Sequence, residues 1–420
     1  MRRYTIVFLL IIVLICSGCE KVTELDEKSF VTAIGFDKGE NYNLRFTFVF
    51  TSPSKSNASD GKDKDETIVV EAPGLYSAME QINNFKSKTV ELTHTQTLIF
   101  SEELAKEGIG EFIYSLVRSN HFRPNTYICI ADNSSMEFLE KINPVQTYHL
   151  EKYFQLLFNK MSSGTKGDLY LYDSYFRLIS DGGAGVLPYC AINENKIISE
   201  EASEMASEEP SESETIGGHF AQNTDDFAIN TIAGDSITKS DNNAEIQGAA
   251  VLKNGEMLTT LGRLEATMLQ MITTTMPKTY FTVTEPSTPS QIVTCYISQA
   301  ESAKIKLICK DTPIIDIIID LEGDFSEIGK DSKYIKEPKL FEEYFEAKVE
   351  ESLKKFLNKT IRELNCDLCG FSDVAKKNFA TTKAWKNYNW NEKFSKASFN
   401  VDVNLTMRTY GELSKEVMYT

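Results

Sequence analysis

The sequence predicts a multi-domain α+β protein, in which mixed and mostly antiparallel sheets carry packed helices. At 420 residues the chain exceeds what one hydrophobic core usually holds, so two or three domains are expected. Short runs that alternate apolar and polar residues recur along the chain, separated by turn-forming segments, as in strands with one buried face. Near the end, a long pattern of helical period precedes a final alternating run, which indicates a helix packed on a sheet.

Residues 1–18 have the features of a cleaved export signal, and Cys19 follows the predicted cut. Arg2 and Arg3 precede an uncharged run over residues 6–16, and these eleven residues are fewer than the roughly 20 that a membrane-spanning helix needs. Two small residues before Cys19 match the bacterial lipobox, in which the thiol receives a diacylglyceryl group. The alternative is an ordinary signal peptide whose removal leaves a free thiol at Cys19.

The charge balance excludes some partners. The chain has 44 basic and 61 acidic residues and a net charge of −17, which repels nucleic acid and anionic lipid headgroups. Electrostatic attraction would therefore not hold the protein at a membrane. Acyl chains on Cys19 would hold it there, because each methylene group buried in the bilayer contributes about 0.8 kcal/mol to membrane binding.

The first predicted domain, residues 19–141, combines a hairpin with a β-α-β unit. Residues 30–50 contain two β-rich runs joined by the turn sequence DKGEN, so they predict a hairpin. Ser101 and the glutamates after it predict the start of a helix that ends at Arg118, between two buried strands. In order, the predicted elements are the hairpin 30–50, a strand at 67–72, a helix at 75–85, a strand at 95–100, a helix at 101–118 and a strand at 126–132.

The predicted middle domain, residues 142–262, is interrupted by an acidic segment at 194–243. Its Glu- and Ser-rich stretch has too few apolar residues to order itself, so it is interpreted as a flexible linker or insertion, with an acidic docking segment as the alternative. Structure resumes at residues 245–262, where a strand, the turn KNGE and a second strand are expected. A helix should follow at once.

The C-terminal domain, residues 263–420, is predicted to be rich in strands around one long helix. Three β-rich runs occupy 291–300, 303–311 and 314–328. Apolar residues then recur every three to four positions from Leu340 to Leu364, which predicts an amphipathic helix lying along a sheet. The closing run 397–413 places Val401, Val403 and Leu405 on one face of a strand that would cover that helix.

No catalytic or metal-binding constellation is apparent in the sequence. The block GDSIT at 234–238 resembles a hydrolase nucleophile motif, but no histidine follows His219 to act as its base. Cys366 and Cys369 form a C-x-x-C with no second ligand pair, and a position before a helix C-terminus at Gly370 is favoured over a redox or zinc site. The sequence therefore predicts a protein without enzymatic activity, cofactor or metal.

Three polar residues stand out in the β-α-β unit. His94 precedes a predicted buried strand, and Arg118 and Arg123 flank the turn before the next one. Guanidinium groups at such turns commonly bind loop carbonyls or carboxylates, so a structural bracing role is favoured. Contact with a partner protein is the alternative role for these three residues.

Several blocks of the sequence together resemble the Ger(x)C family of spore germination lipoproteins. After the lipobox come TELDEKSFVTAIGFDKGENYNLRFTFVFTSP, LTHTQTLIFSEELAKEGIGEFIYSLVRSNHFRPNTYICIAD, IQGAAVLKNGEMLTTLG and SFNVDVNLTMRTYGEL, in the order typical of the family. Two features depart from the family pattern. Glu20 and Lys21 stand where its members usually have a Trp-Asp pair, and the acidic 194–243 segment is atypical.

The resemblance implies a non-enzymatic C subunit of a nutrient germinant receptor, with three mixed α/β domains. It implies a lipid anchor at Cys19, as a diacylglyceryl cysteine with palmitate, on the outer face of the spore inner membrane. It also implies A-type and B-type receptor subunits as partners. The runner-up is a lipid-anchored solute-binding protein that delivers a small molecule to a transporter, and an exported hydrolase is a third possibility.

Overall fold

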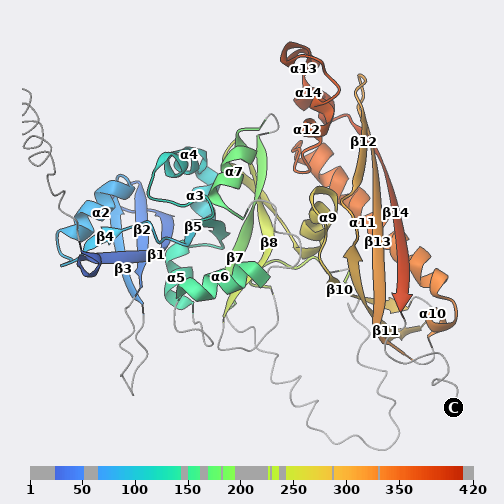
Figure 1. Ribbon diagram of the computed structural model, residues 1–420, viewed down its shortest axis with the longest axis horizontal. Coiled ribbons are helices and arrows are strands. Elements are labelled where there is room, and N and C mark those ends of the chain that lie inside the picture. The colour runs from blue at the N-terminus through green and yellow to red at the C-terminus, as the bar shows by residue number, and fades with distance from the viewer. Residues whose placement is uncertain are drawn as a thin grey trace, which may run out of the picture.

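The described residues form two sheets, each with its own helices, and the two follow one another along the long axis of the molecule (Figure 1). The structure, a computed structural model, describes residues 24–51, 65–142, 150–160, 169–180, 183–193, 226–227, 229–235, 243–285, 288–329 and 332–409. The predicted signal peptide, Cys19 and most of the acidic segment lie outside these residues. Seven of the twelve strand pairings described are antiparallel, so the predicted mixed α+β class is confirmed.

The first sheet has a parallel centre and antiparallel flanks. Its order is β3 (Glu66–Ala72), β2 (Leu44–Phe50), β1 (Lys28–Lys38), β5 (Thr97–Ser101), β6 (Tyr127–Ala131), β7 (Ala184–Ile192), β8 (Ala244–Lys253) and β9 (Glu256–Leu261), and β4 (Thr89–Glu91) pairs with the start of β1. β1, β5, β6 and β7 run parallel. Helices must cross over between parallel neighbours, which is why both faces of this centre are covered.

The helices of the first sheet divide into two layers. One layer packs its apolar side chains on one face and consists of α2 (Leu75–Asn83), α3 (Glu102–Glu107), α4 (Gly110–Arg118) and α7 (Leu171–Leu178). The other layer, α5 (Ser135–Lys141) and α6 (Leu150–Lys160), packs on the opposite face. Both faces of the sheet are therefore hydrophobic, which explains why β5 and β6 are buried along their whole length.

The predicted hairpin is confirmed and is held by aromatic side chains. β1 and β2 pair antiparallel, and Phe36 lies opposite Phe46 with their rings 5.5 Å apart, edge to face. Phe46, Phe48 and Phe50 alternate into the core shared with α2 to α4, as their spacing predicts. The predicted β-α-β unit is confirmed as well, because β5 and β6 pair parallel.

The helix predicted from Ser101 to Arg118 is broken into α3 and α4. Gly108 has φ +119°, and the N–H of Ile109 donates to the carbonyl of Gly255 at 2.7 Å. The β8–β9 turn thus enters the gap between the helices, and a Cβ on Gly255 would lie 2.6 Å from Cα of Gly110. A contact between residues about 145 positions apart interrupts the helix, and no local periodicity could have revealed it.

The second sheet carries the predicted long helix on one face. Its strands are β10 (Thr279–Glu285), β11 (Thr288–Gln299), β13 (Ile314–Ile328) and β12 (Lys304–Ile308), and β14 (Ser398–Thr409) pairs parallel with β13. α11 (Pro338–Asn358) packs on this sheet with α9 (Arg263–Thr273), while the short helices are α10 (Lys333–Lys336), α12 (Phe371–Lys376), α13 (Thr382–Tyr388) and α14 (Trp390–Phe394). The inward side chains of β14 are buried as predicted.

α9 joins the two sheets. It follows β9 directly, and nearly all of its side chains are buried, in one core that includes β7, β8 and the second sheet. Figure 1 shows α9 between the sheets. The first sheet is continuous from β1 to β9, and the predicted boundary between 19–141 and 142–262 falls at the end of α5 within that sheet. These domain bounds remain predictions.

The C-x-x-C does not lie in a helix that ends at Gly370. The long helix ends in a π-helical turn at Lys359–Glu363, and Asn365 takes a left-handed conformation with φ +47°. Cys366 and Cys369 are buried in the turn that follows, and Gly370 begins α12 instead. The expectation of a nearby helix end was right, but its position was wrong by several residues.

Candidate functional site

The main candidate site is a polar cleft where β5 and β6 end. α3 leaves the end of β5 toward one face of the sheet, and α5 leaves the end of β6 toward the other. In α/β sheets, such divergence at the carboxyl ends of neighbouring parallel strands opens a crevice in which ligands commonly bind. Here the crevice has a volume of about 640 Å³. Its lining consists of Glu102, Asp132, Asn133, Ser134, Glu137, Phe138, Tyr189, Ile192, Ile232, Ala233, Gly234, Asp235 and Thr260.

A buried aspartate near the end of β1 fixes the start of α5, the helix that supplies part of the cleft lining. Asp37 accepts hydrogen bonds from the Ser134 hydroxyl at 3.0 Å, the Ser135 N–H and hydroxyl at 2.8 and 2.6 Å, and the Met136 N–H at 2.9 Å. The two backbone N–H groups lie in the first turn of α5 and have no partner within the helix, so a carboxylate is favoured there. α5 can approach because Gly35 has no side chain: a Cβ there would lie 2.5 Å from the Ser135 hydroxyl oxygen.

Tyr189 bridges the two strand ends. Its hydroxyl lies within hydrogen-bond distance of Glu102, at the start of α3, and 3.2 Å from Asp132, just after β6. Burial raises the pKa of Tyr189 far above its ordinary value, so the hydroxyl stays protonated and donates. Burial opposes ionisation of Glu102, but hydrogen bonds from Lys106 and Tyr189 outweigh it and lower the pKa of this carboxyl. Glu102 is therefore an ionised acceptor.

The described lining of the cleft is acidic. It includes four carboxylates and, among the residues that the structure describes, no lysine, arginine or histidine, so it favours a neutral or positively charged polar molecule. Of the GDSIT block, Gly234 and Asp235 lie in the lining, whereas 236–238 lie outside the described residues. Among the residues that the structure describes, no three His, Cys, Asp or Glu side chains are grouped to hold a metal ion.

The three polar residues singled out in the sequence lie elsewhere, near the opposite ends of β5 and β6. His94 is exposed, and its ring is 4.5 Å from that of Phe30. Arg118 is exposed at the end of α4, where it donates to the Tyr114 hydroxyl at 2.9 Å. Arg123 is also exposed, and its carbonyl accepts from the N–H of Thr126.

The structure therefore does not bring these residues to the cleft, and neither of the two roles considered for them is decided. Apart from Gly234 and Asp235 of the GDSIT block, the residues that line the cleft were not identified from the sequence. The signal was present, because Asp132 directly follows the buried strand β6 and Glu102 follows β5. What the sequence did not reveal was the pairing of β6 with β7, the strand that supplies Tyr189.

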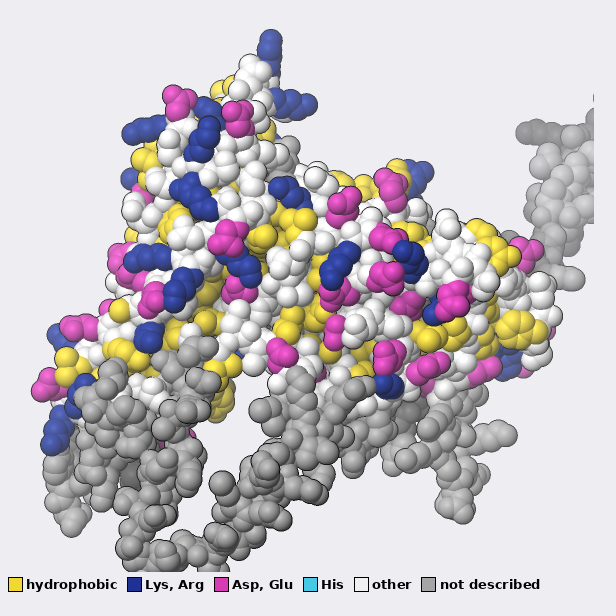
Figure 2. Space-filling model, turned by 180° about the vertical axis from the view of Figure 1, so that it is seen from behind, with side chains coloured by type: hydrophobic (Ala, Val, Ile, Leu, Met, Phe, Trp, Pro, Cys, Tyr) yellow, Lys and Arg dark blue, Asp and Glu magenta, His cyan; other side chains and the backbone are white. Residues whose placement is uncertain are grey.

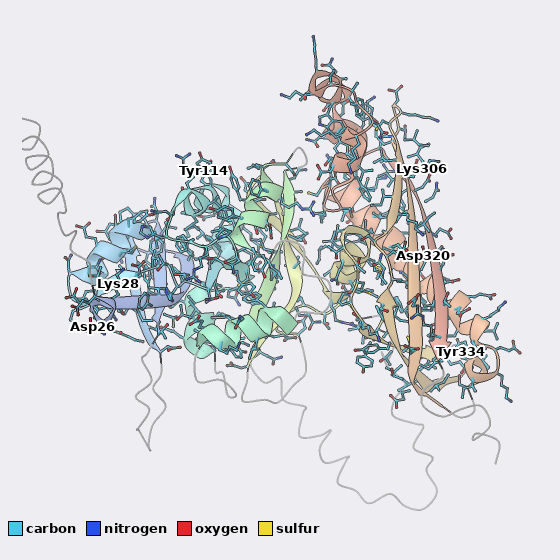
Figure 3. The ribbon with its side chains drawn as sticks, in the orientation of Figure 1. Asp26, Lys28, Tyr114, Lys306, Asp320 and Tyr334 are labelled. Atoms are coloured by element: carbon cyan, nitrogen blue, oxygen red, sulfur yellow. The ribbon has the colours of Figure 1, made fainter. Side chains whose placement is uncertain are left out.

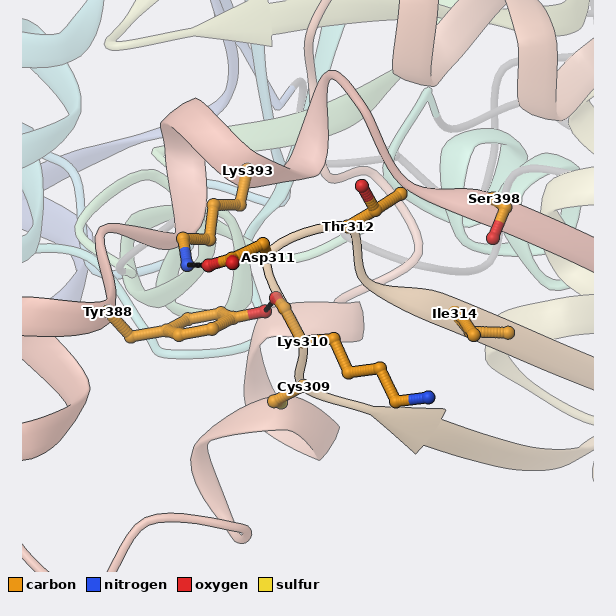
Figure 4. Close-up of a pocket in the computed structure, with 8 residues that line it drawn as sticks. All are labelled: Cys309, Lys310, Asp311, Thr312, Ile314, Tyr388, Lys393 and Ser398. Carbon is orange, nitrogen blue, oxygen red and sulfur yellow. Dashed lines mark hydrogen bonds and ion pairs between the residues drawn. The ribbon is translucent and has the colours of Figure 1, made fainter.

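A second, shallower cleft of about 810 Å³ lies in the C-terminal part, beside the β12–β13 turn (Figure 4). The Tyr388 hydroxyl donates to the Lys310 carbonyl at 2.6 Å, and the Lys393 ammonium lies 2.9 Å from the Asp311 carboxylate. Burial raises the pKa of Tyr388 to about 12, whereas the hydrogen bond from Lys393 lowers that of Asp311. These groups join the turn to α13 and α14, which favours a structural role.

The C-x-x-C turn is organised around a buried aspartate. Asp367 accepts from the N–H groups of Phe371 and Ser372 at 2.8 and 2.6 Å and from the Trp390 indole at 3.2 Å. Burial raises the pKa of Cys366 and of Cys369, which disfavours the reactive thiolate in both. This environment favours the structural interpretation of the pair over a redox role.

Two family models cover most of the chain in the expected order. Residues 21–192 match the model described as "Spore germination protein N-terminal domain", and residues 247–411 match "Spore germination B3/ GerAC like, C-terminal". The class is thus that of spore germination proteins. The chain belongs to the Ger(x)C family, as its sequence blocks predicted.

Individual relatives are distant in sequence, and the extent of the match differs between them. The chain is 18% identical to Spore germination protein B3 of Bacillus subtilis (strain 168), over 98% of this chain and 99% of the relative. It is 24% identical to Spore germination protein KC of the same organism, over 45% of this chain and 49% of that protein. A crystal structure of the GerBC protein covers 93% of this chain and 99% of its own, with a TM-score of 0.48 and 14% identity.

Proposed function

We propose that this protein is the lipid-anchored C subunit of a nutrient germinant receptor, held on the outer face of the spore inner membrane. The observation that carries the proposal is the ordered match of both family models over residues 21–192 and 247–411, which begins two residues after Cys19. Cys19 would carry a diacylglyceryl group and palmitate. None of the helices in the described ranges is long and apolar enough to cross a bilayer.

The lipid anchor would confine the two sheets to the membrane plane beside A-type and B-type subunits. Confinement raises the effective concentration of a partner, so weak surface contacts suffice for assembly. Figure 2 shows acidic and basic side chains interspersed with apolar ones over one face of the molecule, a surface suited to such contacts. The protein would act by association and not by catalysis.

The test is co-immunoprecipitation from detergent-solubilised spore inner membrane. We expect the tagged wild type to bring down A-type and B-type subunits, and Cys19→Ala to be folded but absent from the membrane. Cys16→Ala is the matched control, because it removes a neighbouring thiol and leaves the predicted lipidation site intact. Full membrane retention of Cys19→Ala, or recovery of transporter components instead of receptor subunits, would contradict the proposal.

Arg118 and its surroundings are the proposed contact with another subunit, and His94 and Arg123 are its flanking members. Arg118 lies 5.4 Å from the ring of Tyr114, which is 42% exposed, so an arginine and an aromatic ring are presented together, as in many interface hot spots. Figure 3 shows Tyr114 at the surface of the first half. Arg118→Glu should weaken co-precipitation, whereas Lys306→Glu, an exposed charge change on the second sheet, should not.

The polar cleft favours a second candidate function, a solute-binding protein. The parallel strands β1, β5, β6 and β7 and the crevice at the ends of β5 and β6 are the observations that support it. A panel of neutral and cationic amino acids and sugars would then raise the melting temperature of the wild type. Tyr189→Phe, which removes one hydroxyl from the cleft, should reduce that rise. No shift with any member of the panel favours the receptor-subunit role alone.

A further inference from the structure

An unusually exposed apolar side chain lies at the end of the first sheet at which β1 begins. β4 runs parallel to β1, and Lys28 pairs with Thr89, so the two strands begin at the same edge. The loop at residues 84–88, which precedes β4, therefore lies beside the start of β1. Figure 3 places Asp26 and Lys28 at one end of the molecule, and Figure 1 shows α2 and β4 at the same end.

Phe85 is the residue that this loop presents. Its side chain is 65% exposed, the largest fraction among the exposed large hydrophobic residues that the structure describes. The loop is nevertheless well fixed: the N–H groups of Phe85 and Lys86 both donate to the Ile82 carbonyl, at 3.2 and 2.9 Å. The Lys86 ammonium pairs with Glu66 and lies 4.0 Å from the centre of the Phe50 ring. An ordered loop thus holds a large apolar ring in solvent, and covering that ring with another apolar surface would be favourable in proportion to the area removed from water.

The short length of chain between Cys19 and β1 indicates which surface covers Phe85. Only four residues separate Cys19 from Glu24, the first described residue, so the Cα atoms of the two are at most about 18 Å apart. We infer that Phe85 inserts into the interface of the lipid bilayer and forms a second, non-covalent membrane contact that orients the protein. This inference rests on the proposed lipid anchor at Cys19.

The contact would be apolar and not electrostatic. Glu24, Asp26 and Glu27 are exposed at the same edge, and their charges oppose attraction to anionic headgroups. Lys88 is exposed there too, whereas Lys28 pairs with Glu91 at 3.0 Å. A zwitterionic bilayer is therefore a sufficient partner, and raising the salt concentration should not remove the contact. The anchor compensates for the small area, because a tethered ring meets the surface at high effective concentration.

The experiment places a tryptophan at the contact. Lipidated full-length Phe85→Trp is bound to phosphatidylcholine vesicles whose acyl chains carry bromine, which quenches nearby indole fluorescence. The two natural tryptophans, Trp385 and Trp390, are buried in the C-terminal part and give a constant background. The matched control is Tyr42→Trp. Tyr42 is 51% exposed in the turn after β1, roughly 33 Å away along that strand.

We expect at least a twofold larger loss of the added fluorescence for Phe85→Trp than for Tyr42→Trp, unchanged in 0.5 M salt. Equal quenching of the two variants, while both float with vesicles, would overturn this inference and leave the lipid anchor intact. Flotation of Cys19→Ala is measured in parallel. If that variant floats as well as the lipidated protein, the anchor itself is wrong, and the premise of the inference fails with it.

Discussion

Glu346 of α11 closes the free edge of β14, since one of its carboxylate oxygens accepts a hydrogen bond from the backbone N–H of Leu405 at 2.7 Å. One turn earlier, Glu342 accepts from the N–H of Met407 at 2.8 Å. In the described part of the chain β14 pairs only with β13, so these backbone groups would otherwise form an open strand edge. Open edges template pairing with other chains, and this helix prevents it.

Removing both carboxylates should expose that edge. Glu342→Ala with Glu346→Ala is expected to cost roughly 1–3 kcal/mol of unfolding free energy per lost charge-assisted bond and to promote association. Urea denaturation and light scattering after size exclusion measure the two effects. Glu343→Ala is the control, because Glu343 is exposed on the same helix. Wild-type stability together with an unchanged association state would contradict the role given to the pair.

Asp37 should be among the most sensitive polar positions of the first sheet. Its side chain is 4% exposed and accepts four hydrogen bonds from the start of α5. Asp37→Ala leaves those donors buried, so we expect a loss of roughly 2–4 kcal/mol in the free energy of unfolding. Asp37→Asn should lose less, because it keeps one acceptor oxygen, and exposed Asp26→Ala should lose almost nothing. Comparable stability of all three variants would be the opposing result.

Glu71 should make the stability of the β1–β2 turn depend on pH. Backbone N–H groups of Glu40 and Asn41 and the side chain of Arg45 bind its carboxylate and lower its pKa from 4.5 to about 2. A lowered folded-state pKa contributes stability that is complete above about pH 4.5 and is lost as the pH falls through about 2. The stability difference between wild type and Glu71→Gln should therefore shrink below pH 4.5. The same difference for exposed Glu80→Gln should be small at neutral pH.

Cysteine reactivity should follow burial. Of the six cysteines described, Cys309 is half-buried and the other five are buried. Cys190 lies 3.7 Å from Cys129, and burial raises the pKa of its thiol, so little thiolate exists at pH 8. Mass spectrometry should find iodoacetamide on Cys309 first and on Cys190 only after unfolding in urea. Early labelling of Cys190 in the folded protein would show that this core opens.

Local patterns in the sequence were sufficient for the elements that depend on one buried face. The alternation of Phe46, Phe48 and Phe50 predicted the hairpin, and the three-to-four spacing from Leu340 to Leu364 predicted α11. The same patterns could not predict the break between α3 and α4, because the cause is Gly255, a residue of another hairpin. Gly370 was wrongly taken as a helix C-terminus, because the long helix already changes to a π-helical turn at Lys359–Glu363, before Cys366.

By itself the sequence determined the α+β class, the periodic elements, the net negative charge and the family, because each depends on residues close together in the chain or on composition. Only the tertiary structure decided which residues distant in the sequence lie next to one another. Asp37, Glu102, Asp132 and Tyr189 are separated by tens of residues, and parallel pairing of β1, β5, β6 and β7 brings them to one edge. The physical reason is that side-chain spacing specifies which face of a strand is buried, whereas the choice of neighbouring strand depends on long-range packing.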